Sequence, residues 1–269
     1  MSATDTLEEK STELIEIENV SKLYQGRGES VHALSDIALK IRAGEFISLI
    51  GSSGCGKTTL LRMIADLIQP TEGSIRIGGQ EPKKVRQSRD IGFVFQQPNL
   101  LEWRTVERNV QLPLEISKTP KKERHDRVME ALRVVGLEHA AKRYPHELSG
   151  GMQQRVSIAR ALVSSPKVLL MDEPFGALDE ITRDRLNGEL AQIAADRNLT
   201  VIFVTHAIRE AVFLSDRIVV FSKGPGRITA VFEVSLPQPR EPEVRMTAEF
   251  NELSVQGLRL LEEGEESHL

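Results

Sequence analysis

A glycine-rich loop in the first quarter of the chain constrains its fold more than any other feature. The loop runs from Gly51 to Thr58 with the spacing Gly-x-x-x-x-Gly-Lys-Thr. The apolar run before it, Phe-Ile-Ser-Leu-Ile, is typical of a buried strand, and apolar residues recur at helical spacing from Leu60 to Ile68. Glycines let backbone N–H groups turn inward, and the N-terminus of the following helix favours anions. The sequence therefore predicts a phosphate-binding loop between a strand and a helix.

The residues of this loop are candidate nucleotide ligands. We expect Lys57 to reach the β- and γ-phosphates and the hydroxyl of Thr58 to bind Mg²⁺. The alternative is a glycine-rich surface turn with an ordinary lysine, which the flanking strand and helix make less favourable. The candidate ligands are Gly51, Ser52, Ser53, Gly54, Cys55, Gly56, Lys57, Thr58 and Thr59.

Two adjacent carboxylates follow a second buried strand. The run Val-Leu-Leu-Met at residues 168–171 leads directly into Asp172 and Glu173. Ligands of open α/β sheets collect at the carboxyl ends of the strands, so both side chains are expected near the phosphate loop. Asp172 is the candidate for holding Mg²⁺, and Glu173 for orienting or deprotonating the attacking water. Acidic residues that simply end a strand are common, and the phosphate loop is what strengthens the catalytic interpretation.

A third feature is the octet Leu-Ser-Gly-Gly-Met-Gln-Gln-Arg at residues 148–155. Ser149 is a candidate N-cap, and Gly150 and Gly151 leave the first N–H groups of the helix open to an anion. On spacing alone, an ordinary capped helix is the simpler interpretation. The octet is nevertheless a candidate second anion site.

Composition limits the classes of partner. The chain has 269 residues, of which 28% are charged, and a formal net charge of −4. It therefore lacks the basic field that holds nucleic acid, and no nucleic-acid partner is expected. No apolar run reaches the roughly 18 to 20 residues that span a bilayer, and the polar N-terminus does not read as a signal peptide. We expect a cytoplasmic location.

The periodicity of the chain predicts an α/β fold. Alternating residues from 14 to 41 indicate an antiparallel β layer, and helical patterns at about 98–165 indicate an inserted α-helical subdomain. Strands and helices alternate after residue 166, as in a parallel sheet covered on both faces. Three prolines with several charges at residues 237–243 suggest a linker. The predicted divisions are a flexible tail (1–13), the main domain (14–236), and a linker with a C-terminal helical extension (237–269).

Taken in order, these motifs resemble the nucleotide-binding subunit of an ATP-binding cassette (ABC) transporter. The resemblance covers about residues 14–230, and the octet is nearly diagnostic of that superfamily. It implies an ABC ATPase: a P-loop NTPase core with a parallel sheet, an N-terminal antiparallel β layer and the helical subdomain. ATP and Mg²⁺ are the implied cofactors. The motifs are the phosphate loop, Gln96, the octet, Leu-Leu-Met-Asp-Glu-Pro, Ala-Leu-Asp ending at Asp179, and Val-Thr-His ending at His206.

The resemblance also implies roles for single residues. Tyr24 resembles the aromatic residue that stacks on adenine, and Gln96 the glutamine that touches Mg²⁺ and water. His206 resembles the switch histidine that contacts the γ-phosphate, and Asp179 the residue that links two sites across a dimer. Without the resemblance, Tyr24 would be an ordinary half-buried tyrosine, Gln96 a polar strand end and His206 a structural histidine.

A head-to-tail dimer is a further implication of the resemblance. In it, Ser149, Gly150 and Gly151 of one subunit close over ATP held by Lys57 of the other. Neither the phosphate loop nor the octet encloses a nucleotide alone, which gives the pairing a physical reason. Release of the γ-phosphate charge that both loops bind would then open the dimer.

The run Leu-Leu-Glu-Trp-Arg-Thr at residues 100–105 resembles the Leu-Leu-Pro-Trp-Arg-Thr run of importers for nitrate, alkyl sulfonates and taurine. Glu102 stands where those importers have proline. The implied partners are polytopic permease subunits, contacted near residues 96–105, and indirectly a periplasmic or extracellular solute-binding protein. The implied location is the cytoplasmic face of the membrane, as a peripheral subunit. Trp103 is either an aromatic anchor for the permease or a core residue of the helical subdomain.

Two other classes of protein fit the sequence less well. A soluble ABC ATPase that acts as a switch on nucleic acid or ribosomes fits poorly with the acidic charge and the single cassette. A phosphate-loop kinase or GTPase has no use for the Ser-Gly-Gly octet. The sequence therefore favours the ATPase subunit of an importer.

Overall fold

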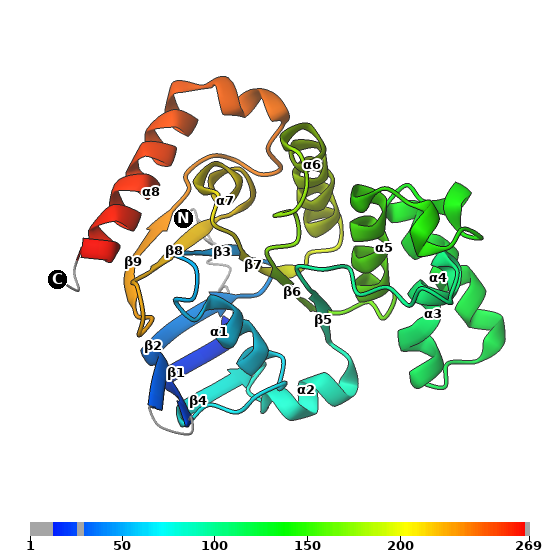
Figure 1. Cartoon of the computed structure of the whole chain (residues 1–269), viewed down its shortest axis with the longest axis horizontal. Coiled ribbons are helices and arrows are strands. Elements are labelled where there is room, and N and C mark those ends of the chain that lie inside the picture. The colour runs from blue at the N-terminus through cyan, green and yellow to red at the C-terminus, as the bar shows by residue number, and fades with distance from the viewer. Residues whose placement is uncertain (1–12, 26–29, 267–269) are drawn as a thin grey trace, which may run out of the picture.

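The structure is a computed structural model that describes residues 13–25 and 30–266. The predicted flexible tail, residues 1–13, lies outside this range except for Glu13, which opens the first strand. Figure 1 shows an antiparallel sheet beside the central sheet, a group of helices at one end, and a long C-terminal helix along the opposite side. Among the described helices, none has the length and apolar character needed to span a membrane.

The predicted antiparallel layer is confirmed. β1 (Glu13–Gln25) lies between β2 (Ser30–Arg42) and β4 (Glu72–Ile77) and pairs antiparallel with both. Ile15 and Ile17 are buried while the glutamates between and after them face outward, as the period of a half-buried strand requires. The pairing of β1 with β2 contains several register shifts. Such irregularities allow two long strands to stay paired although their alternating pattern is interrupted.

The central sheet has the order β5-β6-β7-β3-β8-β9. Its first five strands are parallel, as predicted, and the edge strand β9 is antiparallel to β8. Every residue of β3, β6 and β7 is buried, because helices or the second sheet cover both faces. The strands are β3 (Phe46–Ile50), β5 (Ile91–Val94), β6 (Val168–Asp172), β7 (Thr200–Val204), β8 (Arg217–Phe221) and β9 (Ile228–Glu233).

Alternate residues of these strands belong to two separate cores. Val168 and Leu170 pack with α1 (Lys57–Ile64) and the antiparallel sheet, whereas Leu169 and Met171 pack with α5 (Gly150–Leu162) and its neighbours. The helix that follows the phosphate loop and the helix of the octet therefore cover opposite faces of the central sheet. Figure 1 shows α1 and α5 on either side of β5 and β6.

The helices largely follow the sequence pattern. The predicted helix after the phosphate loop is wrong at its end: it was expected to reach Ile68, but α1 ends at Ile64 because Asp66 takes a left-handed conformation (φ 55°). The edge strand β9 and the helices at residues 82–88 and 106–116 had no clear sequence signal of their own. The remaining helices are α2 (Pro82–Ser88), α3 (Val106–Ile116), α4 (Lys121–Val134), α6 (Glu180–Asp196), α7 (Ile208–Leu214), α8 (Ala248–Glu266), and the short 3₁₀ turns η1 (Glu138–Ala140), η2 (Pro145–Glu147) and η3 (Pro242–Met246).

The C-terminal extension packs against the main domain. Phe250 of α8 is fully buried in the core that holds α5, α6 and α7. Within the segment predicted as a linker, Arg240 is only 4% exposed and donates hydrogen bonds to carbonyls at the end of α7 and just after β9. The segment is thus tied to the domain by a buried side chain.

Candidate active site

The phosphate loop joins β3 to α1 at the carboxyl edge of the central sheet. Gly56 adopts φ 99°, and a β-carbon there would lie 2.6 Å from the carbonyl oxygen of Ala33. Only glycine meets both demands, so the second glycine of the motif is needed for the turn and for close packing on β2. The loop then opens directly into the first turn of α1 at Lys57. The strand-loop-helix context predicted from the sequence is confirmed.

Lys57 points back over the loop. Its Nζ donates to the carbonyl oxygens of Gly51 (2.8 Å) and Ser52 (2.9 Å) and lies 3.3 Å from the Cys55 sulfur. Lys57 is only 5% exposed, so its charge is held against the loop by carbonyl dipoles rather than by a carboxylate. The arrangement presents a desolvated cation where the loop N–H groups are to meet phosphate oxygens.

Thr58 and Asp172 meet as the sequence predicted. The Thr58 hydroxyl donates to Asp172 Oδ1 at 2.7 Å, which links the first turn of α1 to the end of β6. Burial raises the pKa of Asp172, and the Thr58 hydrogen bond acts against that rise. The donor set is one hydroxyl and one carboxylate, both hard oxygen ligands, which fits Mg²⁺ held by few protein groups, phosphate oxygens and water. Thr58 and Asp172 are therefore the residues that would hold the cation.

Glu173 is the meeting point of the other candidate catalytic residues. Gln96 Nε2 donates to Glu173 Oε2 at 3.3 Å, and His206 Nδ1 lies 3.6 Å from the same oxygen. The three side chains come from the ends of β5, β6 and β7, neighbouring strands of the sheet. Glu173 has a left-handed backbone conformation (φ 44°), which is costly for a residue with a β-carbon.

The octet forms a separate site. Ser149 caps α5, as predicted, by accepting a hydrogen bond from the backbone N–H of Met152. Asp179 likewise caps α6 through the N–H of Thr182, which lowers the pKa of Asp179. Ser149, Gly150, Gly151 and Asp179 line one cavity of about 520 Å³. Its described lining holds no residue of the phosphate loop, so the octet and the phosphate loop are separate features of the chain.

Tyr24 lies near the end of β1, opposite Val31 of β2, and the residue is 40% exposed. The Lys22 ammonium sits 5.2 Å from the ring centre. The ring is therefore accessible for stacking, on the strand pair whose β2 member packs against the phosphate loop. Stacking on adenine remains a prediction.

The sequence alone did not indicate that Gly226 supports the phosphate loop. Its N–H donates to the Ala33 carbonyl, and its carbonyl accepts from Ser35 N–H. A β-carbon at Gly226 would lie 1.9 Å from the backbone oxygen of Cys55, inside the loop. The turn after β8 therefore rests directly on the loop. A glycine beside a proline signals a turn, but the partner of that turn lies far away in the sequence.

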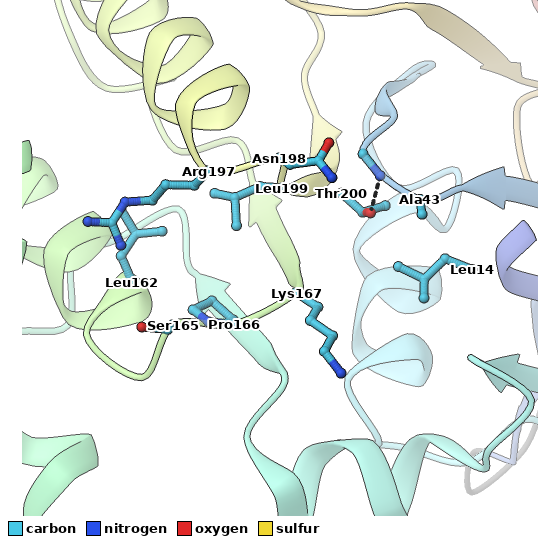
Figure 2. Close-up of a pocket in the computed structure, with 11 residues that line it drawn as sticks. Leu14, Ala43, Leu162, Ser165, Pro166, Lys167, Arg197, Asn198, Leu199 and Thr200 are labelled. Carbon is cyan, nitrogen blue, oxygen red and sulfur yellow. Dashed lines mark hydrogen bonds between the residues drawn. The ribbon is translucent and has the colours of Figure 1, made fainter. Parts of the chain in front are cut away.

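A different cavity, of about 490 Å³, opens at the opposite edge of the sheet (Figure 2). It is lined by residues that precede the parallel strands, including Gly44, Lys167 and Leu199. Ligands of open α/β sheets bind at the carboxyl ends of the strands, where the phosphate loop and Glu173 lie. The cavity of Figure 2 is therefore not the candidate active site.

The open sheet, the phosphate loop at its carboxyl edge and the paired carboxylates define a phosphate-loop nucleoside triphosphatase. The family described as "ABC transporter" matches residues 34–176. The chain belongs to this family and is an ATP-binding subunit that hydrolyses ATP. The fold class predicted from the sequence is confirmed as well.

Several relatives align over most of the chain. An uncharacterized ABC transporter ATP-binding protein of Methanocaldococcus jannaschii is 46% identical over 93% of this chain and 91% of its own. The aliphatic sulfonates import ATP-binding protein SsuB of Bacillus cereus is 43% identical over 93% of this chain and 96% of its own. The bicarbonate transport ATP-binding protein CmpC of Synechococcus elongatus is 47% identical over 84% of this chain, which spans only 34% of CmpC.

Solved structures agree with this assignment. The ATP-binding cassette MJ0796, a dimer in a post-hydrolysis state bound to ADP and Pi, superposes with a TM-score of 0.72. It is 37% identical and covers 83% of this chain and 100% of its own.

Proposed function

We propose that this ATPase subunit powers the import of a small anionic solute, such as nitrate, an alkyl sulfonate or taurine, through separate permease subunits. The run at residues 100–105 resembles importers of those solutes, and relatives similar over most of this chain are named for aliphatic sulfonates and bicarbonate. The observation that carries the coupling chemistry is the convergence of Gln96 and His206 on one oxygen of Glu173.

In the proposed mechanism, the loop N–H groups and Lys57 hold the β- and γ-phosphates. Mg²⁺ bound by Thr58 and Asp172 would offset the phosphate charge. Glu173 accepts a proton from the attacking water or orients it, since its carboxylate is partly exposed beside the phosphate loop. Gln96 holds Glu173 and water in place, and His206 contacts the γ-phosphate. Chemistry of this kind depends mainly on positioning and electrostatics.

The proposed active form is a head-to-tail dimer. Ser149, Gly150 and Gly151 of one subunit would complete the site around ATP held by Lys57 of the other, and Asp179 would link the two sites. The separation of the phosphate loop and the octet on opposite faces of the sheet supports this pairing. The dimeric state of MJ0796 supports it further.

We propose that the permease docks near residues 96–105. Trp103 is 74% exposed, which removes core packing as its role and suits an aromatic anchor. A groove of about 510 Å³ lies nearby between β5, α3 and α5, lined by apolar side chains and by Arg86, Arg89 and Arg160. Docking there would place the subunit on the cytoplasmic face of the membrane, beside Gln96.

The test is a pull-down of tagged Glu173→Gln protein from native membranes with ATP and Mg²⁺ present. This variant should bind ATP and remain in the closed dimer because its water is no longer activated. Recovery of a polytopic membrane protein together with a solute-binding protein would support the importer. Recovery of nucleic acid or ribosomes instead would overturn the transport proposal. The same pull-down with Trp103→Ala tests the docking site, since loss of the permease is expected.

A further inference from the structure

A buried carboxylate lies one turn beyond the switch histidine. Glu210, on α7, is 6% exposed, and its Oε2 accepts a hydrogen bond from the Thr205 hydroxyl at 2.5 Å. The same hydroxyl accepts from the backbone N–H of Ala207 at 3.0 Å. Thr205 N–H in turn donates to Leu49 in β3. The Thr205 hydroxyl thus connects the two residues that flank His206, and Glu210 fixes this hydroxyl by accepting its hydrogen bond.

Packing alone explains this carboxylate poorly. Burial raises the pKa of Glu210, and the Thr205 hydrogen bond is the largest effect that acts against that rise. Oε1 of Glu210 and both amide atoms of Asn187 are buried without a hydrogen-bond partner among the described residues. Polar atoms in that state are costly, so an apolar side chain would fill the position more favourably unless the carboxylate serves the site.

The C-terminal extension fixes the helix that carries Glu210. The Arg245 guanidinium lies 4.1 Å from the centre of the Phe213 ring on α7 and pairs with Asp184 of α6 at 2.8 Å. At the start of α7, Arg209 stacks over Phe250 of α8 at 4.9 Å. α7 is therefore held at both ends against α6 and α8, which leaves Glu210 a fixed support for Thr205.

We propose that Glu210 is a positioning residue for ATP hydrolysis, which orients His206 through Thr205 from a helix that the C-terminal extension holds in place. Glu210 does not touch the nucleotide in this scheme. The inference rests on the proposed contact of His206 with the γ-phosphate. It extends the candidate site to residues outside the nucleotide-binding motifs, including η3 and α8, which hold α7 in place.

The main variant is Glu210→Leu, which removes the acceptor for Thr205 but fills the same space without a buried charge. Thr205→Val removes the hydroxyl itself, and Glu210→Gln and Thr205→Ser keep the hydrogen bond. The matched control is Glu45→Gln. Glu45 is also 6% exposed and pairs with Arg217, but it lies at the opposite edge of the sheet.

We would measure steady-state ATP hydrolysis, the dissociation constant for ADP and the melting temperature of each purified full-length variant. Misplacing a catalytic group by about 1 Å can cost about a hundredfold in rate, so kcat of Glu210→Leu and Thr205→Val should fall by about tenfold to a hundredfold. ADP lacks the γ-phosphate, and its affinity should stay within about twofold. Glu210→Gln, Thr205→Ser and Glu45→Gln should keep kcat within about threefold of the unaltered protein.

The decisive comparison repeats Glu210→Leu and Thr205→Val in a His206→Ala background. If both residues act through His206, neither should lower the remaining rate by more than about twofold, because residues that work as a unit are non-additive. An equal loss in both backgrounds would overturn the inference and leave the role of His206 standing. A normal rate in His206→Ala alone would instead overturn the role of His206, and the inference with it.

Discussion

Replacing Arg240 with lysine should destabilise the protein although the charge is kept. The Arg240 side chain is buried after the prolines of residues 237–239, and its guanidinium takes the place of a cap for the last carbonyls of α7. Burial lowers the pKa of Arg240 to about 10, with Asp216 acting against the fall. Nη1 donates to the carbonyls of Val212, Phe213 and Ser215, and Nη2 to those of Val234 and Leu236.

The size of the effect follows from counting donors. Nη1 and Nη2 carry four N–H groups that serve five carbonyls, so one N–H is already shared. A lysine ammonium has three N–H groups, so even with the same sharing at least one carbonyl loses its partner, which costs about 1–3 kcal/mol in the free energy of unfolding. The lysine side chain is also shorter, and its compact ammonium cannot reproduce the planar guanidinium of Arg240, which reaches both α7 and the segment after β9.

Urea denaturation followed by circular dichroism measures this loss, with the slope of the transition checked for constancy. The control is Arg133→Lys, because Arg133 is 66% exposed and pairs with Glu138 at 2.9 Å. An exposed pair of that kind contributes at most about 1 kcal/mol. If the free energy of unfolding of Arg240→Lys lay within about 0.5 kcal/mol of that of the unaltered protein, the capping argument for Arg240 would be refuted.

The other predictions concern the nucleotide site. Gly226→Ala should weaken ATP binding, measured by calorimetry, at least about tenfold, because the new β-carbon collides with the Cys55 carbonyl. The control Gly188→Ala should not weaken binding, since a β-carbon at Gly188 meets nothing within 4 Å. Ser149→Arg should leave ADP binding by the monomer unchanged and abolish the ATP-dependent dimer in size-exclusion chromatography; a normal dimer would contradict the shared-site proposal. Asp172→Asn should abolish Mg²⁺-dependent hydrolysis yet raise the stability of the nucleotide-free protein at pH 7. The reason is that the pKa of Asp172 is raised in the folded protein, so its ionisation opposes folding; the gain should shrink as the pH falls towards the ordinary value of 3.8.

Local patterns predicted the elements whose burial is uniform. β6, β7 and β8 are short apolar runs between polar residues, and they form the strands of the alternating pattern expected after residue 166. The end of α1 was not predictable from periodicity, because Leu67 and Ile68 continue the helical spacing after the chain has turned at Asp66. β9 lies at the edge of the sheet among the described strands, and its mixed residues gave no strand signal.

The candidate site divides in the same way. Glu173 was predictable from position, because it directly follows a buried parallel strand whose carboxyl end faces the phosphate loop. For Gln96 and His206, only the resemblance to the ABC family made their roles predictable. The supporting contacts of Gly226 and Arg240 were not predictable, since each depends on a partner that only the tertiary fold supplies. A sequence motif identifies the groups that touch a ligand more readily than the groups that hold them in place.

The separation of the two anion-binding loops follows from the fold rather than from any single motif. Alternate side chains of β6 pack into different cores, so α1 and α5 must cover opposite faces of one sheet. Lys57 and Ser149, which lie at the N-terminal ends of these helices, therefore cannot close on one nucleotide without a large rearrangement of the buried core. A second copy can supply the missing half while both cores stay intact. The close packing of a single subunit is thus the physical reason for the proposed head-to-tail pairing.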